Sequence, residues 1–260
     1  MRAILATLSM AAGMAWAQTS LTPPQVGFMR DAADSLRPVY GIAGNFLVGD
    51  PVAIGVISAA HSGSYGWVKT SSTVAVIDKA GAIVATSTVA DGPALFAFTR
   101  TGEPALAYLP ASNQLRTWKA GAFTAVSFDA AILAANSVLA VAAPDSGHAA
   151  MIVQRDDGLW DVRVQLATSE IDAQTALLGV AAPVLMFASG DLVYSDADGI
   201  VLRKPDGSER HIIARLPSSF AFQQMGIGWV QLQDLAGGQQ FAFRIAQNRE
   251  QSYQLPEVDQ

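Results

Sequence analysis

Three histidines, His61, His148 and His211, are the side chains of this sequence best suited to metal binding or to proton transfer near neutral pH. A metal site would need them to converge together with carboxylates. In the arrangement of strands and turns derived below, His61 and His148 lie in or just after turns of two different repeats, and His211 lies on an outer strand. We therefore expect three separate histidines at turns or at the surface, and no metal site.

Nucleophilic catalysis lacks its usual sequence patterns. The chain contains no cysteine, which excludes thiol nucleophiles, zinc–thiolate sites and iron–sulfur clusters. The Gly-x-Ser-x-Gly motif of serine hydrolases is absent, and Ser62-Gly63-Ser64 after His61 is typical of a turn. We therefore expect no catalytic residue and no cofactor.

Polar side chains in predicted turns are the remaining candidates for ligand binding. They are Asp91, Asn113, Asp129, Asp156, Asp157, Asp196 and Asp198. If several acids from different repeats share one face, they can bind a cation or a polar ligand such as a glycan. Tight turns also require Asp and Asn for purely local reasons, which is the alternative. The run Asp196-Ala197-Asp198-Gly199 lacks the later glutamate of an EF-hand loop, so it predicts no calcium site of that kind.

Composition limits the possible classes of protein. The chain has 260 residues, of which 51% are hydrophobic and 15% charged, and its formal net charge is -6. Such a chain has enough apolar material for a core and is neither disordered nor a coiled coil. An acidic chain is also unsuited to nucleic acid, because binding to phosphates needs a basic surface.

The first residues have the pattern of an export signal. Arg2 supplies a positive charge, an apolar run follows as far as Met14, and Ala15-Trp16-Ala17 has the form of a small-x-small cleavage site. This run is too short to cross a membrane as a helix. The sequence therefore predicts a signal peptide at 1–17, no membrane span, and a periplasmic or extracellular protein.

From Val39 onward, short apolar segments alternate with turns rich in Gly, Asp, Asn and Pro. They group in sets of four, and the third segments of successive sets begin at Thr73, Leu115, Leu159, Ile200 and Gln251. A four-stranded unit with a period of roughly 42 residues is typical of a β-propeller blade. The sequence thus predicts an all-β propeller domain at 39–260 with five blades. A β-sandwich is the alternative.

Two further segments concern the ends of this domain. Pro23-Pro24, the spacing of Val26, Met29, Ala33 and Leu36, and Pro38 predict a short helix over Gln25–Leu36, within an N-terminal helical segment at 18–38. The fifth set has only three segments, and an open sheet edge is unfavourable. We therefore expect the strand at Tyr40–Val48 to join the last sheet and close the ring.

The repeats resemble those of secreted bacterial β-propellers without the WD, kelch or aspartate-box signatures. This resemblance implies a fold but transfers no catalytic residue. Some five-bladed propellers hydrolyse sugars with two carboxyl groups, and none occurs on the segments expected to line the axis. These segments are Val52–Ile57, Ala94–Phe98, Val138–Ala142, Val184–Ala188 and Gly226–Val230. We therefore expect an exported, non-enzymatic platform for an unknown protein or glycan. A hydrolase of extracellular polysaccharide is the alternative.

Overall fold

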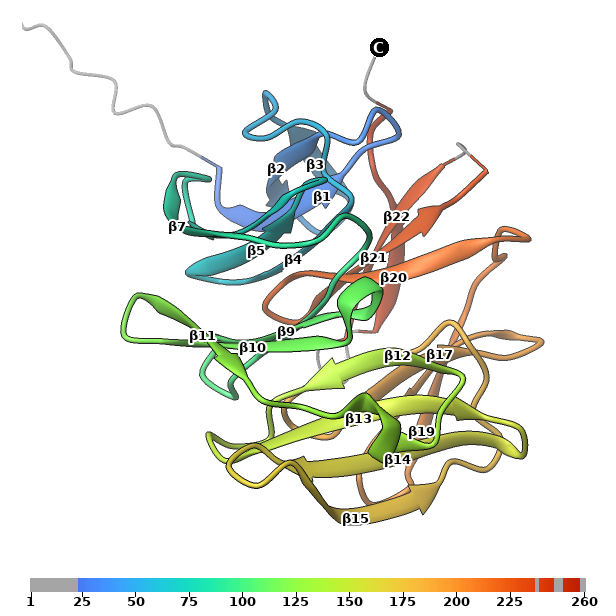
Figure 1. Ribbon diagram of the computed structural model, residues 1–260. Coiled ribbons are helices and arrows are strands. Elements are labelled where there is room, and N and C mark those ends of the chain that lie inside the picture. The colour runs from blue at the N-terminus through green and yellow to red at the C-terminus, as the bar shows by residue number, and fades with distance from the viewer. Residues whose placement is uncertain (1–22, 237–238, 246–249, 258–260) are drawn as a thin grey trace, which may run out of the picture.

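The chain forms six antiparallel sheets arranged as the blades of a β-propeller (Figure 1). This computed structural model describes residues 23–236, 239–245 and 250–257, so the predicted signal peptide lies outside the described residues. Within the described part, no helix is long and apolar enough to span a membrane.

The strands follow one another outward in each sheet. The first sheet contains β1 (Gln25–Arg30), β2 (Leu36–Ile42) and β3 (Asn45–Val48). The second contains β4 (Ser58–Ser62), β5 (Tyr65–Lys69), β6 (Thr73–Asp78) and β7 (Ile83–Thr88). The third contains β8 (Leu95–Phe98), β9 (Pro104–Leu109), β10 (Gln114–Lys119) and β11 (Ala122–Val126).

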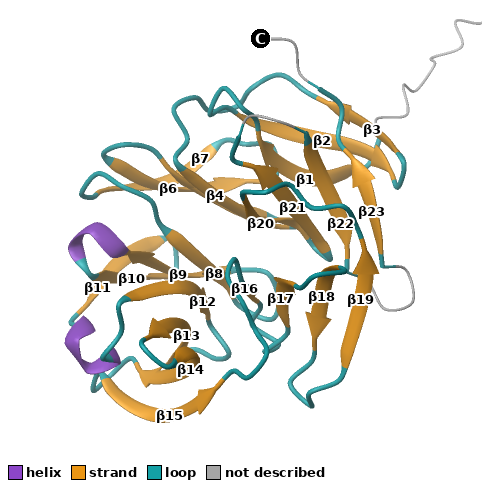
Figure 2. Cartoon of the chain, turned by 90° about the vertical axis from the view of Figure 1, so that its right-hand side faces the viewer, coloured by secondary structure: helices purple, strands orange, loops and turns teal. Residues whose placement is uncertain are grey.

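The remaining sheets also have four strands each. The fourth contains β12 (Ser137–Ala142), β13 (His148–Arg155), β14 (Gly158–Gln165) and β15 (Glu170–Ala176). The fifth contains β16 (Leu185–Met186), β17 (Leu192–Ser195), β18 (Gly199–Arg203) and β19 (Glu209–Ile213). The sixth contains β20 (Phe220–Gly226), β21 (Trp229–Asp234), β22 (Gln240–Arg244) and β23 (Gln251–Gln254). Two short 3-10 turns, η1 (Pro110–Ser112) and η2 (Ala130–Leu133), are drawn in purple in Figure 2.

Burial along the strands explains why the sequence forms blades. The middle strands are covered by a neighbouring sheet on both faces, so β6 and β13 contain continuous runs of buried apolar residues. The outer strands β7 and β15 are largely exposed and carry Thr, Ser, Gln and Glu. Between sheets, Trp67 of β5 is buried, its ring stacks on Phe96 of β8 at 5.4 Å, and its indole N–H donates to the Ala97 carbonyl. The core is therefore a series of apolar layers between adjacent sheets.

The expected number of blades, five, is wrong, because two segments form strands that the sequence did not reveal. The expected helix over Gln25–Leu36 is instead β1, a turn and the start of β2. The inner strand of the last sheet is β20 at Phe220–Gly226, not the expected Gly226–Val230, so the sixth sheet is complete without the N-terminal segment. In β1, Phe28 and Met29 are both buried because sheets pack on either side of them. Such two-sided burial removes the period-two pattern that identifies a strand.

The expected closure strand is also wrong. The segment Tyr40–Val48 contains the end of β2 and all of β3, which pair with each other, and β2 also pairs with β1. The segment adds no strand to the last sheet. The β-sandwich alternative is excluded by the six sheets.

The first sheet differs from the other five in its strand direction. Gly27 lies against Gly226, whereas Arg30 reaches back to Gln231, so β1 runs antiparallel to β20. In contrast, the end of β4 lies beside the end of β20, where Gly63 approaches Ile227. The first sheet thus corresponds to the second, third and fourth strands of a blade that lacks its inner strand. Its neighbours β4 and β20 meet directly at the hub.

Side chains, not a shared strand, close the ring. One apolar cluster joins Met29 and Phe46 of the first sheet to Met225 and Leu255 of the last part of the chain. A second cluster joins Phe28 to the second sheet. The first and last sheets accordingly lie together at the top of Figure 1.

A buried amide also links the first and last sheets. The Gln231 side chain accepts from the Arg30 backbone N–H at 3.1 Å and donates to the Arg30 carbonyl at 2.8 Å. Gln231→Leu leaves both backbone groups unpaired, so we expect a loss of about 1–3 kcal/mol in the free energy of unfolding. Urea denaturation measures this loss. The exposed-edge variant Gln251→Leu is the control, and equal stability of the two variants would contradict this role of Gln231.

Candidate functional site

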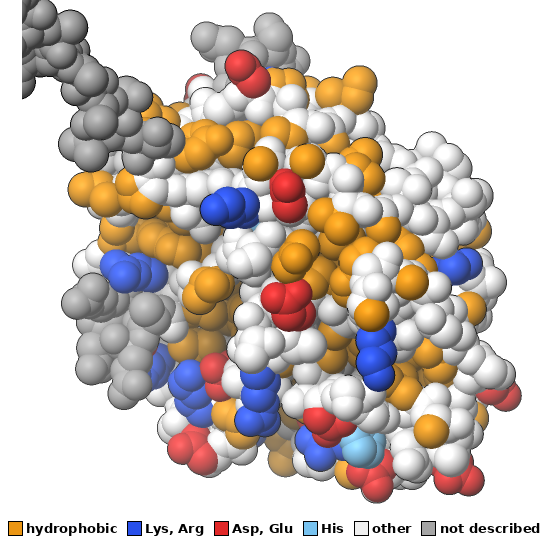
Figure 3. Space-filling view, turned by 90° about the vertical axis from the view of Figure 1, so that its left-hand side faces the viewer, with side chains coloured by type: hydrophobic (Ala, Val, Ile, Leu, Met, Phe, Trp, Pro, Cys, Tyr) orange, Lys and Arg blue, Asp and Glu red, His pale blue; other side chains and the backbone are white. Residues whose placement is uncertain are grey.

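The turns of the propeller emerge on two faces because successive strands alternate in direction. The acidic face carries the turns that join second to third strands and one sheet to the next, including residues 110–113, 129–136, 156–157 and 196–198. The opposite face carries the turns after first and third strands, including 63–64, 100–102, 188–191 and 227–228. The opposite face is turned toward the viewer in Figure 3.

All seven predicted site residues lie on the acidic face. Most of their side chains form hydrogen bonds with backbone or side-chain groups of nearby residues. Asp91 accepts from the Gly92 N–H at 2.7 Å, and Asp129 accepts from the Ala131 N–H at 2.9 Å. Asp196 accepts from the backbone N–H groups of the two residues that complete its own turn. These contacts are the local turn interactions that favour Asp at such positions.

The other predicted residues bind side chains. Asp156 accepts from Asn136, and Asp157 accepts from the Trp160 indole, each at 2.9 Å. Asn113 accepts from the Tyr108 hydroxyl, also at 2.9 Å. Asp198 is exposed.

Two of the seven share a hollow. Asn113 and Asp129 both line a hollow of about 510 Å³ on the acidic face, together with Asn136, the partner of Asp156. The structure does not bring the other acids into this hollow. In the part of the chain that the structure describes, no group of three or more His, Asp or Glu side chains is placed to hold a metal ion. Ligand binding by the seven residues therefore stays a prediction.

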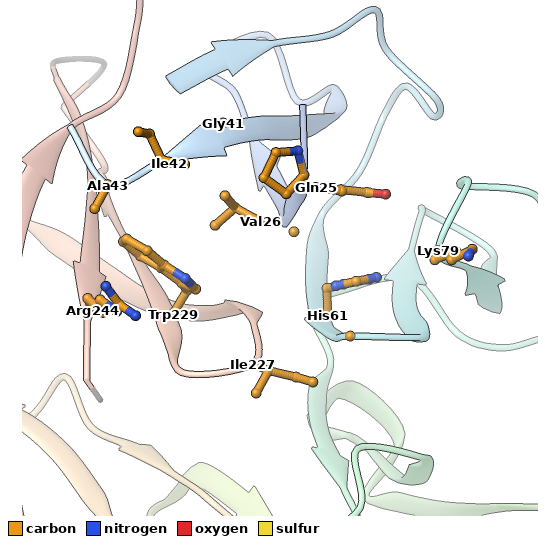
Figure 4. A pocket seen from close by; sticks show the side chains of 13 residues that line it. Gln25, Val26, Gly41, Ile42, Ala43, His61, Lys79, Ile227, Trp229 and Arg244 are labelled. Atoms are coloured by element: carbon orange, nitrogen blue, oxygen red, sulfur yellow. The ribbon is translucent and has the colours of Figure 1, made fainter. Parts of the chain in front are cut away.

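A different hollow, of about 450 Å³, opens on the opposite face where the first and last sheets meet (Figure 4). β1 lies between its two walls. Trp229 and Arg244, from β21 and β22, form one wall, and His61 from β4 and Lys79 lie on the other side. Its lining residues are Pro24, Gln25, Val26, Gly27, Gly41, Ile42, Ala43, His61, Gly63, Lys79, Ile227, Trp229 and Arg244.

His61 is buried beside this hollow, which corrects the expectation that it lies at a surface turn. It is the penultimate residue of the inner strand β4, is 3% exposed, and its ring meets that of Phe28 edge-on at 4.7 Å. Burial lowers the pKa of His61 from 6.5 to about 4, an effect only partly opposed by the backbone at Met225. Neither ring nitrogen has a hydrogen-bond partner of good geometry among the described residues. The ring is thus neutral at pH 7, and its polar neighbour is the Met225 backbone, at a hydrogen-bond geometry that is poor.

The hollow combines a second unpaired polar group with apolar and basic walls. The Gln25 Nε2 is buried and has no partner among the described residues. Ile42 and Ile227 are 66% and 71% exposed. The Arg244 guanidinium lies 5.8 Å from the Trp229 ring centre. The lining contains two cations and no carboxylate among the described residues, so the arrangement favours a ligand with hydrogen-bond acceptors and an apolar part.

His148 and His211 are separate from this hollow, as expected. His148 Nδ1 lies 2.8 Å from Asp145, and this hydrogen bond lowers the pKa of the Asp145 carboxyl. His211 Nδ1 on β19 lies 3.2 Å from Asp196 in the β17–β18 turn of the same sheet. The two histidines therefore each pair with a nearby acid.

The residues around the propeller axis are apolar on the inner strands and polar at the turns. An axial hollow of about 300 Å³ is lined by Ala97, Phe98 and Met186, but also by Arg100 and Asp191 near the turns. Asp191 forms an ion pair with Lys204 at 2.8 Å. Among the described lining residues this hollow holds one carboxylate, whereas both mechanisms of glycoside hydrolysis use two.

Sequence analysis missed the hollow beside His61 because its parts come from three sheets far apart in the chain. One signal was available. His61 follows Ser58, Ala59 and Ala60, a small-residue segment that continues the apolar run of the first repeat, so a strand position was compatible with the pattern. Gln25 offered no such signal, since its strand was interpreted as a helix.

Comparisons with known proteins bear on the fold alone. No protein-family model matches the sequence, and no curated protein is significantly similar to it. A solved structure of a nidogen/laminin complex is similar, with a TM-score of 0.54, 13% identity, and coverage of 88% of this chain and 92% of that one. A protein of unknown function from Bacteroides caccae also has a TM-score of 0.54, with 9% identity and coverage of 91% and 100%. These likenesses and the six sheets together establish a β-propeller fold.

Proposed function

We propose that this chain is an exported, non-enzymatic binding protein that holds its ligand in the hollow beside His61. Export rests on the signal-peptide pattern at 1–17. The observation that carries the binding role is a pair of unsatisfied polar groups, Gln25 Nε2 and the His61 ring, which lie at the edge of a hollow. Leaving such groups unpaired costs about 1–3 kcal/mol each, and a bound acceptor removes that cost.

The chemistry of the walls defines the ligand class. The Gln25 amide N–H favours a carbonyl oxygen, while Ile42 and Ile227 offer apolar surface. The acetamido group of an N-acetylated glycan combines a carbonyl, an N–H and a methyl group, so it suits both parts. A peptide carbonyl of a protein partner has the same acceptor. The glycan and protein partners expected from the sequence both remain compatible with this hollow.

A hydrolase is less well supported. Each of the four hollows has at most one carboxylate among its described lining residues. The axial hollow and the hollow between the fourth and fifth sheets share part of their lining and hold Asp191 and Asp161, but Asp191 is paired with Lys204. Hydrolysis of a glycosidic bond by either usual mechanism needs a pair of carboxyl groups across the bond. The hydrolase alternative would gain support from measurable release of reducing sugar from a polysaccharide.

A matched pair of sugars tests the proposed binding. Diacetylchitobiose and cellobiose share a backbone, but only the first carries acetamido groups. We expect diacetylchitobiose to bind in isothermal titration calorimetry and cellobiose to bind at least tenfold more weakly. Loss of one hydrogen bond corresponds to about 1.4 kcal/mol, so Gln25→Leu should raise the Kd for diacetylchitobiose about tenfold.

Ser112→Ala is the control variant. Ser112 Oγ is also buried and unpaired beside a hollow, but on the acidic face. The Ser112→Ala variant should bind diacetylchitobiose with the affinity of the wild type. Equal affinity for the two sugars, or unchanged affinity in Gln25→Leu, would contradict an acetamido site beside His61.

A further inference from the structure

A second hollow on the opposite face has a charge unlike that of the whole chain. It measures about 420 Å³ and lies between the fourth and fifth sheets. Its basic lining residues are Arg100, Arg163, Arg203 and Lys204, and its one acid among the described residues is Asp161. The chain carries a net charge of -6, so this excess of cations is local. Basic and acidic side chains are interspersed on the lower half of the face in Figure 3.

Structural roles account for only some of these cations. Lys204 pairs with Asp191 at 2.8 Å, and Arg203 donates to the Leu178 carbonyl at 3.0 Å and lies 3.8 Å from Glu209. The Arg100 Nε donates to the Ala188 carbonyl at 3.3 Å, so the two terminal nitrogens of its guanidinium can bind a ligand. Arg163 is exposed and has no hydrogen bond or ion pair with any described residue.

Asp161 and Arg163 occupy the same side of β14. They are two residues apart on one strand, so both side chains project toward the fifth sheet. The Asp161 Oδ1 is buried without a hydrogen-bond partner among the described residues. Burial raises the pKa of the Asp161 carboxyl, and the charge of Arg163 opposes this rise. The hollow therefore contains both cationic donors and an unused carboxylate oxygen.

The floor of this hollow is apolar. Ala142, Ala150, Met186 and Leu192 line it and belong to the buried cluster between the fourth and fifth sheets. A compact ring can lie on such a floor while its polar groups face the rim.

We propose that this hollow binds a hydroxylated oxyanion, a sugar acid or sugar phosphate, with Arg100 and Arg163 on the oxyanion and Asp161 accepting from a hydroxyl. Guanidinium groups suit carboxylate and phosphate because their N–H donors match the spacing of the two oxygens. An unpaired carboxylate oxygen suits a hydroxyl donor. This site is separate from the hollow beside His61 and shares none of its lining residues.

Calorimetric titration of the full chain with glucuronate, glucose 6-phosphate, glucose and acetate tests the proposal. At low salt we expect at least one of the two charged sugars to bind, and glucose and acetate each to bind at least tenfold more weakly. Raising the salt to about 0.5 M should weaken binding, because salt screens exposed charges. Absence of heat with both charged sugars would overturn the proposal. So would equal binding of glucose.

Three variants locate the site. Arg163→Gln should raise the Kd for the charged sugar at least tenfold, and Asp161→Leu should remove its advantage over acetate. Arg116→Gln is the control, because Arg116 lies on β10 and binds Ser87. It should leave the Kd unchanged. Unchanged binding in Arg163→Gln or Asp161→Leu, or equal weakening in Arg116→Gln, would overturn the assignment.

One further variant separates this site from the proposed function. Gln25→Leu alters only the hollow beside His61, so it should bind the charged sugar like the wild type. If Gln25→Leu abolishes that binding, the oxyanion lies in the hollow beside His61 and the present proposal is wrong. Thermal unfolding of each variant shows whether a loss of binding reflects a loss of folded protein.

Discussion

Gly27→Ala should destabilise the whole propeller by about 3 kcal/mol, which corresponds to roughly 6 to 12 °C in Tm for a domain of this size. Gly27 of β1 and Gly226 of β20 face each other where the first and last sheets meet. A Cβ on Gly27 would lie 1.6 Å from the Met225 carbonyl oxygen, and one on Gly226 would lie 2.1 Å from the Val26 carbonyl oxygen. Both obstacles are backbone atoms, so no side-chain rotation relieves the clash. The alanine must separate β1 from β20 and thereby open the ring.

Gly147→Ala provides the matched control for this experiment. A Cβ there would lie 3.4 Å from the Asp145 Oδ1, an ordinary contact in an exposed turn. We expect its stability to stay within about 0.5 kcal/mol of the wild type. Thermal unfolding followed by circular dichroism at pH 7 measures both variants. If Gly27→Ala melts at the temperature of Gly147→Ala, the contact between β1 and β20 does not hold the ring closed.

Acid should destabilise the protein through His61. The pKa of this ring is about 4 in the folded chain, against 6.5 for an unperturbed histidine. The unfolded chain therefore takes up a proton as the pH falls through about 6.5, whereas the folded chain takes it up only near 4. The stability that the neutral ring contributes is complete above pH 6.5 and is lost between pH 6.5 and 4. The loss amounts to about 3 kcal/mol over that interval.

His61→Leu removes this contribution, because leucine does not titrate. Urea denaturation at pH 7 and at pH 4 should show a fall in stability that is smaller by about 3 kcal/mol in the variant than in the wild type. His211→Leu is the control, since His211 is exposed on β19 and lies outside the hollow. The His211→Leu variant should therefore show the same fall in the free energy of unfolding between pH 7 and pH 4 as the wild type. A fall of equal size in His61→Leu and wild type would show that His61 is not the group responsible.

The repeat was the part of the fold that the sequence revealed best. The third strands expected at Thr73, Leu115, Leu159 and Ile200 begin in the structure at Thr73, Gln114, Gly158 and Gly199. β22, the third strand of the last sheet, begins at Gln240 and continues this period. The segment at Gln251, which we had taken as a third strand, is the outer strand β23. The last repeat was therefore assigned one strand out of phase, which also produced the error in ring closure.

The candidate sites could be predicted much less well. The seven acids and amides of the acidic face were identified because Asp and Asn mark turns, but the same turn chemistry occupies most of their side chains. The hollows lined by Gln25, His61 and Asp161 lie on the opposite face. Their residues had no motif, because Gln25, His61 and Asp161 became conspicuous only through burial without a partner. Burial of a single polar side chain depends on which sheets pack over it.

Local pattern and chain-wide packing thus determined different properties of this protein. Alternating apolar residues and regular turns specify extended segments and their grouping in fours, because strand formation and turn chemistry depend on neighbours in the sequence. The reversed direction of β1 and the burial of His61 depend on contacts between segments far apart in the chain, such as Arg30 with Gln231. No local preference encodes such a contact. The tertiary structure alone decided where the ring closes and which polar groups are buried without a partner among the described residues.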